Sequence, residues 1–298
     1  MGIPQAELLT VRDWLRYAVS RFNAAQLAYG HGTHTALDEA AYLLLNRLHL
    51  PVDDINPWLD ATLLPEERQK LYDIVEERIS SRKPAAYLTR EAWIGKNRFY
   101  VDERVIVPRS FIGELLTTGG LAHLRLGGDN EPRVLDLCTG SGCLAILCAL
   151  AFENARVDAS DVSTDALDVA ARNVHEYRLQ DRIVLAQGDL FAPWVGNRYD
   201  LIVANPPYVD DAARAAFPPE YAAEPAIAHA GGADGLAIVR RILAEGADFL
   251  TPNGTLVVEI GSGRTILEQQ YPQVDFLWLD TAESEGEVFA LSTSAWRA

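Results

Sequence analysis

The segment Asn205-Pro206-Pro207-Tyr208 has the residue types and spacing best suited to chemistry in this 298-residue chain. It follows an apolar run, Tyr199–Ala204, which predicts a buried strand that ends abruptly at the asparagine. Two consecutive prolines fix φ and lack amide donors, so the turn is rigid and the Pro206 carbonyl is not drawn into a helix. Asn205 adds a side-chain oxygen acceptor beside that carbonyl, and the Tyr208 ring can stack on a flat π system.

Two fixed oxygen acceptors suit an NH2 group, which has two hydrogens to donate. The nitrogen of an amide or aromatic amine is a poor nucleophile because its lone pair is delocalised. Acceptors that hold both hydrogens would aim the lone pair at an electrophilic carbon and favour the positive charge developing on nitrogen. A lone Asn-Pro-Pro would more simply be a turn after a strand. Here it follows a glycine loop and a suitably spaced aspartate, which favours the chemical interpretation.

The glycine loop lies in Asp136–Ala145, between a predicted strand and a predicted helix. Gly140, Gly142 and Ala145 fit the fingerprint G-x-G-x-x-G/A, in which glycines let the backbone turn tightly and approach a ligand. Asp161 lies about twenty residues further on, where a carboxylate that binds a ribose belongs. Its alternative role is a favourable charge at the start of the next helix. The pattern predicts a ligand containing adenosine, and it leaves NAD and S-adenosylmethionine open.

Two further aspartates bear on the choice of ligand. Asp136 stands just before the glycine turn, where its charge would repel a pyrophosphate and attract a methionine ammonium group. Capping of loop amides is its alternative role. Asp189 follows the next predicted strand and could accept from an adenine amino group, with Leu190 or Phe191 against the ring, although an ordinary Gly-Asp turn explains it equally well. We therefore expect S-adenosylmethionine as cofactor. Its expected contacts are Asp136, Thr139, Gly140, Gly142, Asp161, Asp189, Leu190 and Asn205.

Strand-like and helical runs alternate from Arg133 onward, and this predicts an α/β fold with a doubly wound, mostly parallel sheet. The predicted strands are 134–138, 156–159, 183–186, 201–204, 255–260 and 288–291. The most clearly amphipathic helix covers 163–177.

The first ninety residues predict a small helical domain. Helix starts are expected at Thr10, at Thr35 with Asp38, and at Pro65. A hairpin is expected over 93–101, and glycines at 119–120 and 127–130 should bracket a short helix. We predict a helical substrate-recognition domain at 1–90, a hairpin and linker at 91–125, and a catalytic domain at 126–298.

The composition limits the class of partner. The chain has 26 Lys and Arg against 42 Asp and Glu, a net charge of −16. This charge disfavours naked nucleic acid and suits a basic protein partner, although solubility alone would also explain it. Three cysteines without a CxxC pair suit a reducing compartment, and six scattered histidines predict no metal site. Without a signal peptide or an apolar stretch of membrane-spanning length, the protein is expected to be soluble and cytoplasmic.

Taken together, Asp136–Gly142, Asp161, Asp189 and Asn205–Tyr208 resemble class I, S-adenosylmethionine-dependent amino-group methyltransferases. The resemblance is closer to the HemK-type protein-(glutamine-N5) methyltransferases and covers nearly the whole chain. It extends to Val107–Ser110 and to three later signatures. These are Glu220–Pro225, Gly231–Gly235 and Val258–Gly261.

Release-factor enzymes of this family usually read Pro-Arg-Pro-Glu-Thr-Glu after the hairpin, whereas this chain reads Pro-Arg-Ser-Phe-Ile-Gly from Pro108. It is therefore most similar to the branch that methylates a glutamine of large-subunit ribosomal protein uL3, and its acidic charge fits that basic client. The resemblance implies that Asn205 and the Pro206 carbonyl hold the glutamine amide while Tyr208 packs on it. It places Arg109 and Ser110 where the substrate enters. A salt bridge joining the two domains is the alternative for Arg109.

Four other functions stay open. Peptide chain release factors are the second choice of protein client, after uL3, which the chain would methylate during ribosome assembly. Adenine-amino methylation of nucleic acid uses the same Asn-Pro-Pro-Tyr segment, but the acidic chain lacks an evident basic DNA-reading domain. An NAD-dependent dehydrogenase would need a proton-handling residue that is not apparent. A non-catalytic ribosome-binding module would not need Asn205.

Overall fold

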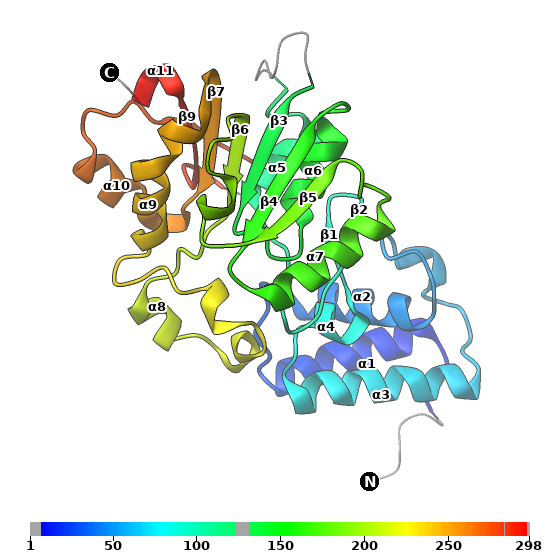
Figure 1. The fold of residues 1–298 in the computed structure, drawn as a ribbon. Helices are drawn as coiled ribbons and strands as arrows, with labels where there is room; N and C mark the ends of the chain where they lie inside the picture. The colour runs from blue at the N-terminus through cyan, green and yellow to red at the C-terminus, as the bar shows by residue number, and fades with distance from the viewer. Residues whose placement is uncertain (1–6, 123–130, 283, 297–298) are drawn as a thin grey trace. The chain divides into compact units, whose positions relative to one another are not determined.

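The computed structural model describes residues 7–122, 131–282 and 284–296 (Figure 1). It divides into two compact units. One unit contains Met1–Glu91 with Phe217–Ala223, and the other contains Ala92–Ala216 with Glu224–Ala298. The predicted loop at 127–130 lies outside the described residues. No helix in the described ranges combines the length and the apolar character needed to cross a membrane.

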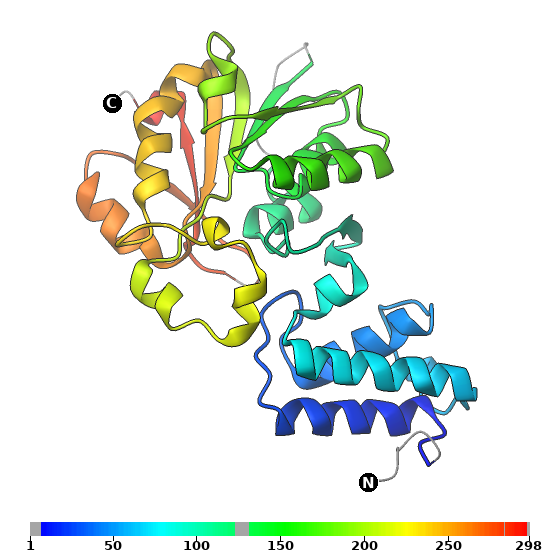
Figure 2. The same cartoon turned by 60° about the horizontal axis from the view of Figure 1, so that its bottom comes forward.

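The first unit is helical (Figure 2). Its α-helices are α1 (Val11–Ala24), α2 (Ala36–Arg47), α3 (Pro65–Ser81) and α4 (Ala85–Thr89), with a 3₁₀ turn, η2, at Asn56–Trp58. All three predicted helix starts are confirmed. Thr10 forms a capping box with Asp13, the Thr35 hydroxyl accepts from the Asp38 amide, and Pro65 occupies the first turn of α3. Trp14, Phe22, Leu43, Leu44 and Leu71 are fully buried in the core of the unit.

A seven-residue segment from the second half of the chain, Phe217–Ala223, belongs to this helical unit. The sequence pattern placed it in the catalytic domain. Its Glu220 is fully buried and accepts from the Ala28 amide at 3.1 Å. The same carboxylate lies 3.2 Å from Arg82 and 3.8 Å from Arg78. Because burial of a lone carboxylate is costly, these partners make the segment an integral part of the unit.

The guanidinium of Arg78 connects two carboxylates inside the unit. Arg78 is fully buried, and its Nε donates to Glu39 at 2.7 Å while Nη2 donates to the Ala28 carbonyl at 3.1 Å. Burial raises the pKa of Glu39, and Arg78 acts against that rise. The segment thus completes a charge network that Glu39 and Arg78 begin.

We expect Glu220→Ala to lower the free energy of unfolding of the helical unit by about 3 kcal/mol, because the positive charge of the buried Arg78 then loses one of its two carboxylate partners. Urea denaturation followed by far-UV circular dichroism measures this. The control is Glu66→Ala, which removes an exposed carboxylate from the first turn of α3. Equal stabilities of the two variants would contradict the structural role of Glu220.

The second unit is built on a seven-stranded sheet with the order β5-β4-β3-β6-β7-β9-β8. Strands β3 to β7 are parallel, and β9 runs antiparallel to both β7 and β8. The predicted doubly wound, mostly parallel sheet is therefore confirmed. The strands are β3 (Arg133–Leu137), β4 (Arg156–Asp161), β5 (Ile183–Gln187), β6 (Tyr199–Ala204), β7 (Leu250–Glu259), β8 (Leu277–Leu279) and β9 (Val288–Ser292).

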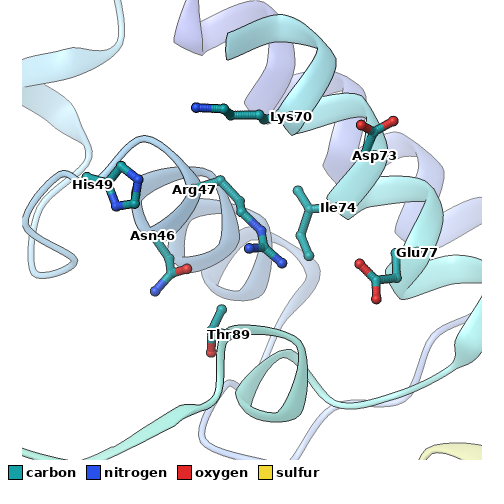
Figure 3. A pocket seen from close by; sticks show the side chains of 8 residues that line it. All are labelled: Asn46, Arg47, His49, Lys70, Asp73, Ile74, Glu77 and Thr89. Carbon is teal, nitrogen blue, oxygen red and sulfur yellow. The ribbon is translucent and has the colours of Figure 1, made fainter. Parts of the chain in front are cut away.

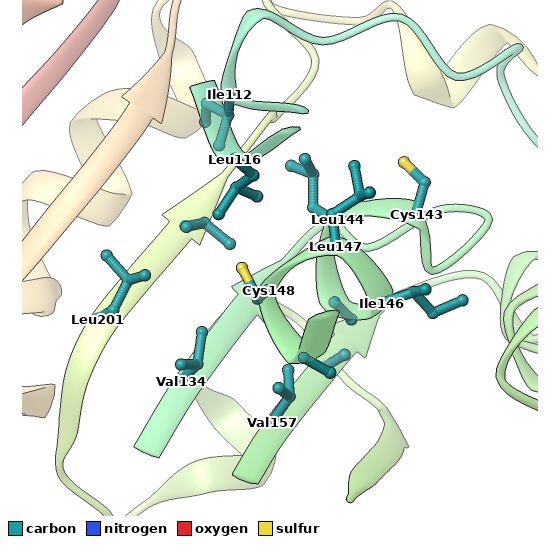
Figure 4. Close-up of a cluster of buried hydrophobic side chains, with 14 of the residues drawn as sticks. Ile112, Leu116, Val134, Cys143, Leu144, Ile146, Leu147, Cys148, Val157 and Leu201 are labelled. Carbon is teal, nitrogen blue, oxygen red and sulfur yellow. The ribbon is translucent and has the colours of Figure 1, made fainter. Parts of the chain in front are cut away.

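Helices cover the sheet through two apolar clusters. One cluster joins α5 (Phe111–Thr118) and α6 (Cys143–Ala151) to β3, β4 and β6, and Figure 4 shows Leu116, Leu147 and Cys148 among its side chains. The other joins α9 (Ala237–Glu245) and α10 (Arg264–Gln270) to the sheet. The remaining elements of this unit are α7 (Thr164–Glu176), α8 (Asp211–Ala215), α11 (Thr293–Trp296) and the 3₁₀ turns η3 (Ala192–Trp194), η5 (Ala226–Ala228), η6 (Gly246–Phe249) and η7 (Gly261–Gly263). The 3₁₀ turn η4 (Pro219–Ala223) belongs to the helical unit.

The predicted hairpin is present as β1 (Glu91–Ile94) and β2 (Asn97–Tyr100). Several elements were not predicted, among them α4, the short helix α8 in the stretch expected to be a loop, α11, α5 and β8. Helix α5 is capped at its start by Ser110, whose hydroxyl accepts from the Gly113 amide, and at its end by Gly119 in the left-handed conformation. Strand β8 has three residues, which are too few to show an alternating pattern.

Candidate functional site

The candidate site lies where the order of the parallel strands reverses. From β3 the chain passes outward to β4 and β5, and it then returns to form β6 on the other side of β3. Ligands of open α/β sheets bind at the carboxyl ends of the strands beside such a point. Leu137 at the end of β3 is in register with Ala204 at the end of β6. The glycine loop and the Asn-Pro-Pro-Tyr turn therefore leave the sheet as neighbours.

The glycine loop has room for a ligand at Gly140. This residue has a φ of +54°, and a Cβ added there would meet nothing within 4 Å. Its amide donates to Asp161 Oδ2 at 2.9 Å, and the Thr139 amide donates to the Ser160 carbonyl at 3.0 Å. At Gly142, by contrast, a Cβ would lie 3.1 Å from the Ala170 Cβ in α7. Gly140 thus provides open space, whereas Gly142 allows the loop to pack on a helix.

Asp136 is fully buried beneath this loop. Its Oδ2 accepts from the Thr139 hydroxyl at 2.5 Å and from the Ala145 amide at 3.0 Å, so it does cap the loop. Its Oδ1 has no hydrogen-bond partner among the described residues, and desolvation raises the pKa of the carboxyl group to about 7. A buried acceptor without a partner fits a ligand that brings a donor or a positive charge. The residues present therefore fit the ammonium end of S-adenosylmethionine.

We expect Asp136→Asn to raise the melting temperature of the cofactor-free protein at pH 8 by a few degrees. Because the pKa of Asp136 is raised from 3.8 to about 7, ionisation in the folded state destabilises the protein as pH rises through that interval. The Asn oxygen can still accept from Thr139 and Ala145. Thermal unfolding at pH 5 and pH 8 measures the effect, and a gain in stability no larger at pH 8 than at pH 5 would contradict it.

The other predicted cofactor residues occupy neighbouring strand ends. Asp161 accepts from the Ser163 amide through Oδ1 and from Gly140 through Oδ2. Asp189 is exposed and pairs with Arg241 at 2.8 Å. Leu190 is buried, and its carbonyl accepts from the Ser160 hydroxyl at 3.0 Å. The structure thus gives each of them a structural partner, and their contacts with a cofactor stay predictions.

The Asn-Pro-Pro-Tyr turn is held at both ends. Asn205 Nδ2 donates to the Arg109 carbonyl at 3.4 Å, which makes Oδ1 the atom of this amide available to accept from a substrate. Pro206 is buried and Pro207 is half-buried. At the far end the Tyr208 hydroxyl donates to Glu259 Oε1 at 3.0 Å. Tyr208 is therefore fixed by its hydroxyl as well as by its ring.

Three glycines of the later signatures pack against Tyr208. A Cβ at Gly261 would lie 2.8 Å from the Tyr208 ring, and Gly261 has a φ of +55°. Cβ atoms at Gly231 and Gly235 would lie 2.7 Å from the Tyr208 carbonyl carbon and 2.4 Å from its carbonyl oxygen. These glycines allow a close approach to the turn, which is a role that sequence patterns alone did not reveal.

Arg109 pairs with a carboxylate of its own unit. Its two guanidinium nitrogens donate to Glu224 at 2.7 and 2.9 Å. Glu224 is buried, also accepts from the Val107 amide at 2.9 Å, and lies 2.9 Å from His229 Nε2. The alternative of a salt bridge between two domains is therefore wrong for this pair. Contact of Arg109 with a substrate stays a prediction.

Ser110 has two structural contacts. It caps α5, and its hydroxyl donates to Glu259 Oε2 at 2.7 Å. The Phe111 amide donates to the same oxygen at 2.9 Å. Glu259 is almost fully buried. No local sequence pattern indicates the role of this glutamate, because its partners are distant in sequence.

Asn173 is a further residue whose role no sequence motif predicted. It lies on the buried face of α7, and its Nδ2 donates to the Ser141 carbonyl at 2.8 Å. Its Oδ1 accepts from the Tyr100 amide at 2.7 Å. An asparagine among the apolar positions of an amphipathic helix was the available signal. Asn173 thereby supports the glycine loop from the helix side.

The helical unit carries an open groove of about 550 Å³ (Figure 3). Side chains from the end of α2, from α3 and from α4 line it. They are Asn46, Arg47, His49, Lys70, Asp73, Ile74, Glu77 and Thr89. The groove therefore offers both cationic and anionic groups.

Comparison with known proteins identifies relatives over almost the full chain. The family model described as methyltransferase small domain matches residues 121–217. The ribosomal protein uL3 glutamine methyltransferase of Bordetella pertussis is 56% identical over 96% of this chain and 96% of its own. The protein of the same name from Bradyrhizobium diazoefficiens is 50% identical over 98% of this chain and 93% of its own.

Solved structures also resemble the chain. The hMettl16 catalytic domain, in complex with an RNA hairpin, aligns with a TM-score of 0.49 and 15% identity over 80% of this chain and 85% of that chain. A methyltransferase from Pyrococcus furiosus aligns with a TM-score of 0.44 and 17% identity over 63% of this chain and 89% of that chain. Because it is 50–56% identical in sequence to these curated relatives over nearly its full length, the chain belongs to the family of ribosomal protein uL3 glutamine methyltransferases.

Proposed function

We propose that this chain transfers a methyl group from S-adenosylmethionine to the side-chain amide nitrogen of a glutamine in ribosomal protein uL3. The observation that carries the proposal is the register of β3 with β6, which brings the Asn205 turn out of the sheet beside the glycine loop. The names of its close relatives support the client. The acidic charge of the chain suits a basic ribosomal protein.

The cofactor would be held by the glycine loop and the strand ends beside it. Asp136 Oδ1 would accept from the ammonium group, Gly140 would let the backbone approach, and Asp161 would accept from the ribose. Asp189 and Leu190 would contact the adenine. When bound, the cofactor supplies a methyl group made electrophilic by the sulfonium. No metal is required by this chemistry.

The chain itself orients the nucleophile. Asn205 Oδ1 and the Pro206 carbonyl would accept the two hydrogens of the glutamine amide, which directs the nitrogen lone pair away from both acceptors. As the N–C bond forms and the methyl–sulfur bond breaks, positive charge develops on nitrogen and these oxygens stabilise it. The bond from Asn205 Nδ2 to the Arg109 carbonyl fixes which atom of the Asn205 amide accepts. One amide hydrogen then leaves as a proton.

We expect Asn205→Ala to reduce methyl transfer about 100-fold, the effect typical of losing one preorganised charge-stabilising group. Cofactor affinity should change much less, since the glycine loop, Asp136 and Asp161 are retained. Single-turnover transfer to purified uL3 and calorimetric titration with S-adenosylhomocysteine measure the two effects. Activity equal to that of the wild type would exclude the two-acceptor mechanism.

We expect Asp161→Ala to weaken the binding of S-adenosylhomocysteine about tenfold or more, since one charge-assisted hydrogen bond contributes about 1.5–3 kcal/mol. It also removes the acceptor of the Gly140 amide. The matched control is Asp165→Ala, which removes a carboxylate from the first turn of the adjacent helix α7. Unchanged calorimetric affinity in the Asp161 variant would refute its role in cofactor binding.

The client is met in the cytoplasm, where ribosomal proteins are made and assembled. We assign its recognition to the helical unit, whose groove presents Asp73 and Glu77 as partners for basic residues.

Mass spectrometry of ribosomal proteins from cells that lack this gene tests the identity of the client. The expected result is uL3 lighter by about 14 Da, the mass of one methylene group. Loss of that mass from a release factor instead, or methylation of an adenine oligonucleotide by the purified chain, would overturn the proposal.

A further inference from the structure

We propose that Glu259 is a positioning residue, whose buried carboxylate holds the segment at Ser110–Phe111 and the Asn-Pro-Pro-Tyr turn in register around Asn205. The inference rests on the proposed function for its catalytic consequence. It goes beyond that function because the two-acceptor mechanism of Asn205 and Pro206 does not itself involve Glu259. Its geometry can also be tested without any methyl transfer.

Three donors from two distant segments converge on this one carboxylate. Oε2 accepts from the Ser110 hydroxyl at 2.7 Å and from the Phe111 amide at 2.9 Å. Oε1 accepts from the Tyr208 hydroxyl at 3.0 Å. Glu259 is 1% exposed, so water does not replace these bonds if they are lost. Each donor would then be a buried polar group without its partner, which is costly.

The two segments held by Glu259 are those that define the position of Asn205. Arg109, whose carbonyl accepts from Asn205 Nδ2, directly precedes Ser110 in the chain. Tyr208 ends the turn three residues after Asn205. Glu259 therefore fixes the group that orients the Asn205 amide and also fixes the far end of the turn. Displacement of either would move the two acceptors relative to each other.

A carboxylate is the side chain that suits these three donors, because it accepts several hydrogen bonds and donates none. Aspartate would be one methylene shorter and would not reach both segments from the end of β7. The close approach of Gly261 to the Tyr208 ring brings the hydroxyl to the carboxylate. Glu259 and Gly261, which lie in one signature, thus both serve to hold Tyr208.

The charge state of Glu259 gives the proposal a measurable consequence. Burial raises the pKa of Glu259 to about 7, although the Ser110 and Tyr208 hydroxyls and the backbone amides act against the rise. The other titratable groups around it are the Tyr208 hydroxyl and the Cys143 thiol of α6. Arg109 lowers the pKa of Tyr208, and Glu287 raises it. Arg109 is itself neutralised by Glu224.

Protonation adds a donor to a site that already contains three donors. At least one bond must then be lost or reversed, and we expect kcat to fall as pH decreases below about 7. Glu259→Gln carries a permanent donor and should behave like the protonated form at every pH. Measured with saturating cofactor, whose ammonium group would keep Asp136 ionised, its kcat should be about three- to tenfold below that of the wild type at pH 8 and should lack the step near pH 7. Glu259→Ala should lose more activity than Glu259→Gln.

A double-mutant cycle assigns the effect to Tyr208. Tyr208→Phe retains the ring and removes the hydroxyl donor, so Glu259→Gln should have little further effect on kcat in that background. Glu285→Gln is the matched control, because it neutralises an exposed glutamate near the start of β9. It should leave the pH profile of kcat unchanged. Equal effects of Glu259→Gln in both backgrounds would overturn the proposed coupling.

Hydrogen exchange tests the positioning role independently of the client. In Glu259→Gln and Glu259→Ala, the amides of Phe111 and Tyr208 should exchange at least tenfold faster than in the wild type, while those in β3 and β4 should not change. Unchanged exchange at Phe111 and Tyr208 would refute the inference, whatever the chain methylates. Faster exchange in the two variants, together with no methylation of uL3 by the wild-type chain, would instead count against the proposed function alone.

Discussion

The site depends on buried carboxylates that serve as hydrogen-bond partners for irregular backbone. Loops at the carboxyl ends of β3 and β6 leave the sheet and lose their ladder partners, yet they stay largely buried. Asp136 accepts for the glycine loop, Glu224 for Val107 and Arg109, and Glu259 for Ser110, Phe111 and Tyr208. Buried polar groups need such partners, so the carboxylates replace secondary structure at the places where the chain must be irregular.

The three carboxylates differ in how their charge is compensated. Glu224 is paired with Arg109, whereas Asp136 and Glu259 are held by neutral donors, and desolvation raises the pKa of each to about 7. A carboxylate that is held without a cation costs stability when it is ionised. Proteins retain such costs most often at functional sites, where the charge has a use in binding or positioning. Asp136 has the unsatisfied oxygen and Glu259 the full set of donors, which fits binding for the first and positioning for the second.

The glycines of the second unit complement these carboxylates. Gly261, Gly231 and Gly235 allow the chain to close around Tyr208, and Gly142 allows the glycine loop to reach α7. Gly140 differs because the space beside it is open. One residue type therefore has two uses in this site: most of these glycines permit packing within the chain, and Gly140 leaves room for a ligand.

Local sequence determined the strand–helix alternation, the helix starts at Thr10, Thr35 and Pro65, and the rigid Asn-Pro-Pro turn, because each depends on residues within a few positions of one another. It also located the glycine loop and Asp161 from spacing alone. Only the tertiary structure revealed the contacts of Glu259, Glu224 and Asn173 and placed Phe217–Ala223 in the helical unit. Their partners are far away along the chain, 149 residues for Ser110 with Glu259 and 115 for Arg109 with Glu224. A hydrogen bond between such residues leaves no periodic trace in the sequence, so it is decided by how the strands and loops pack.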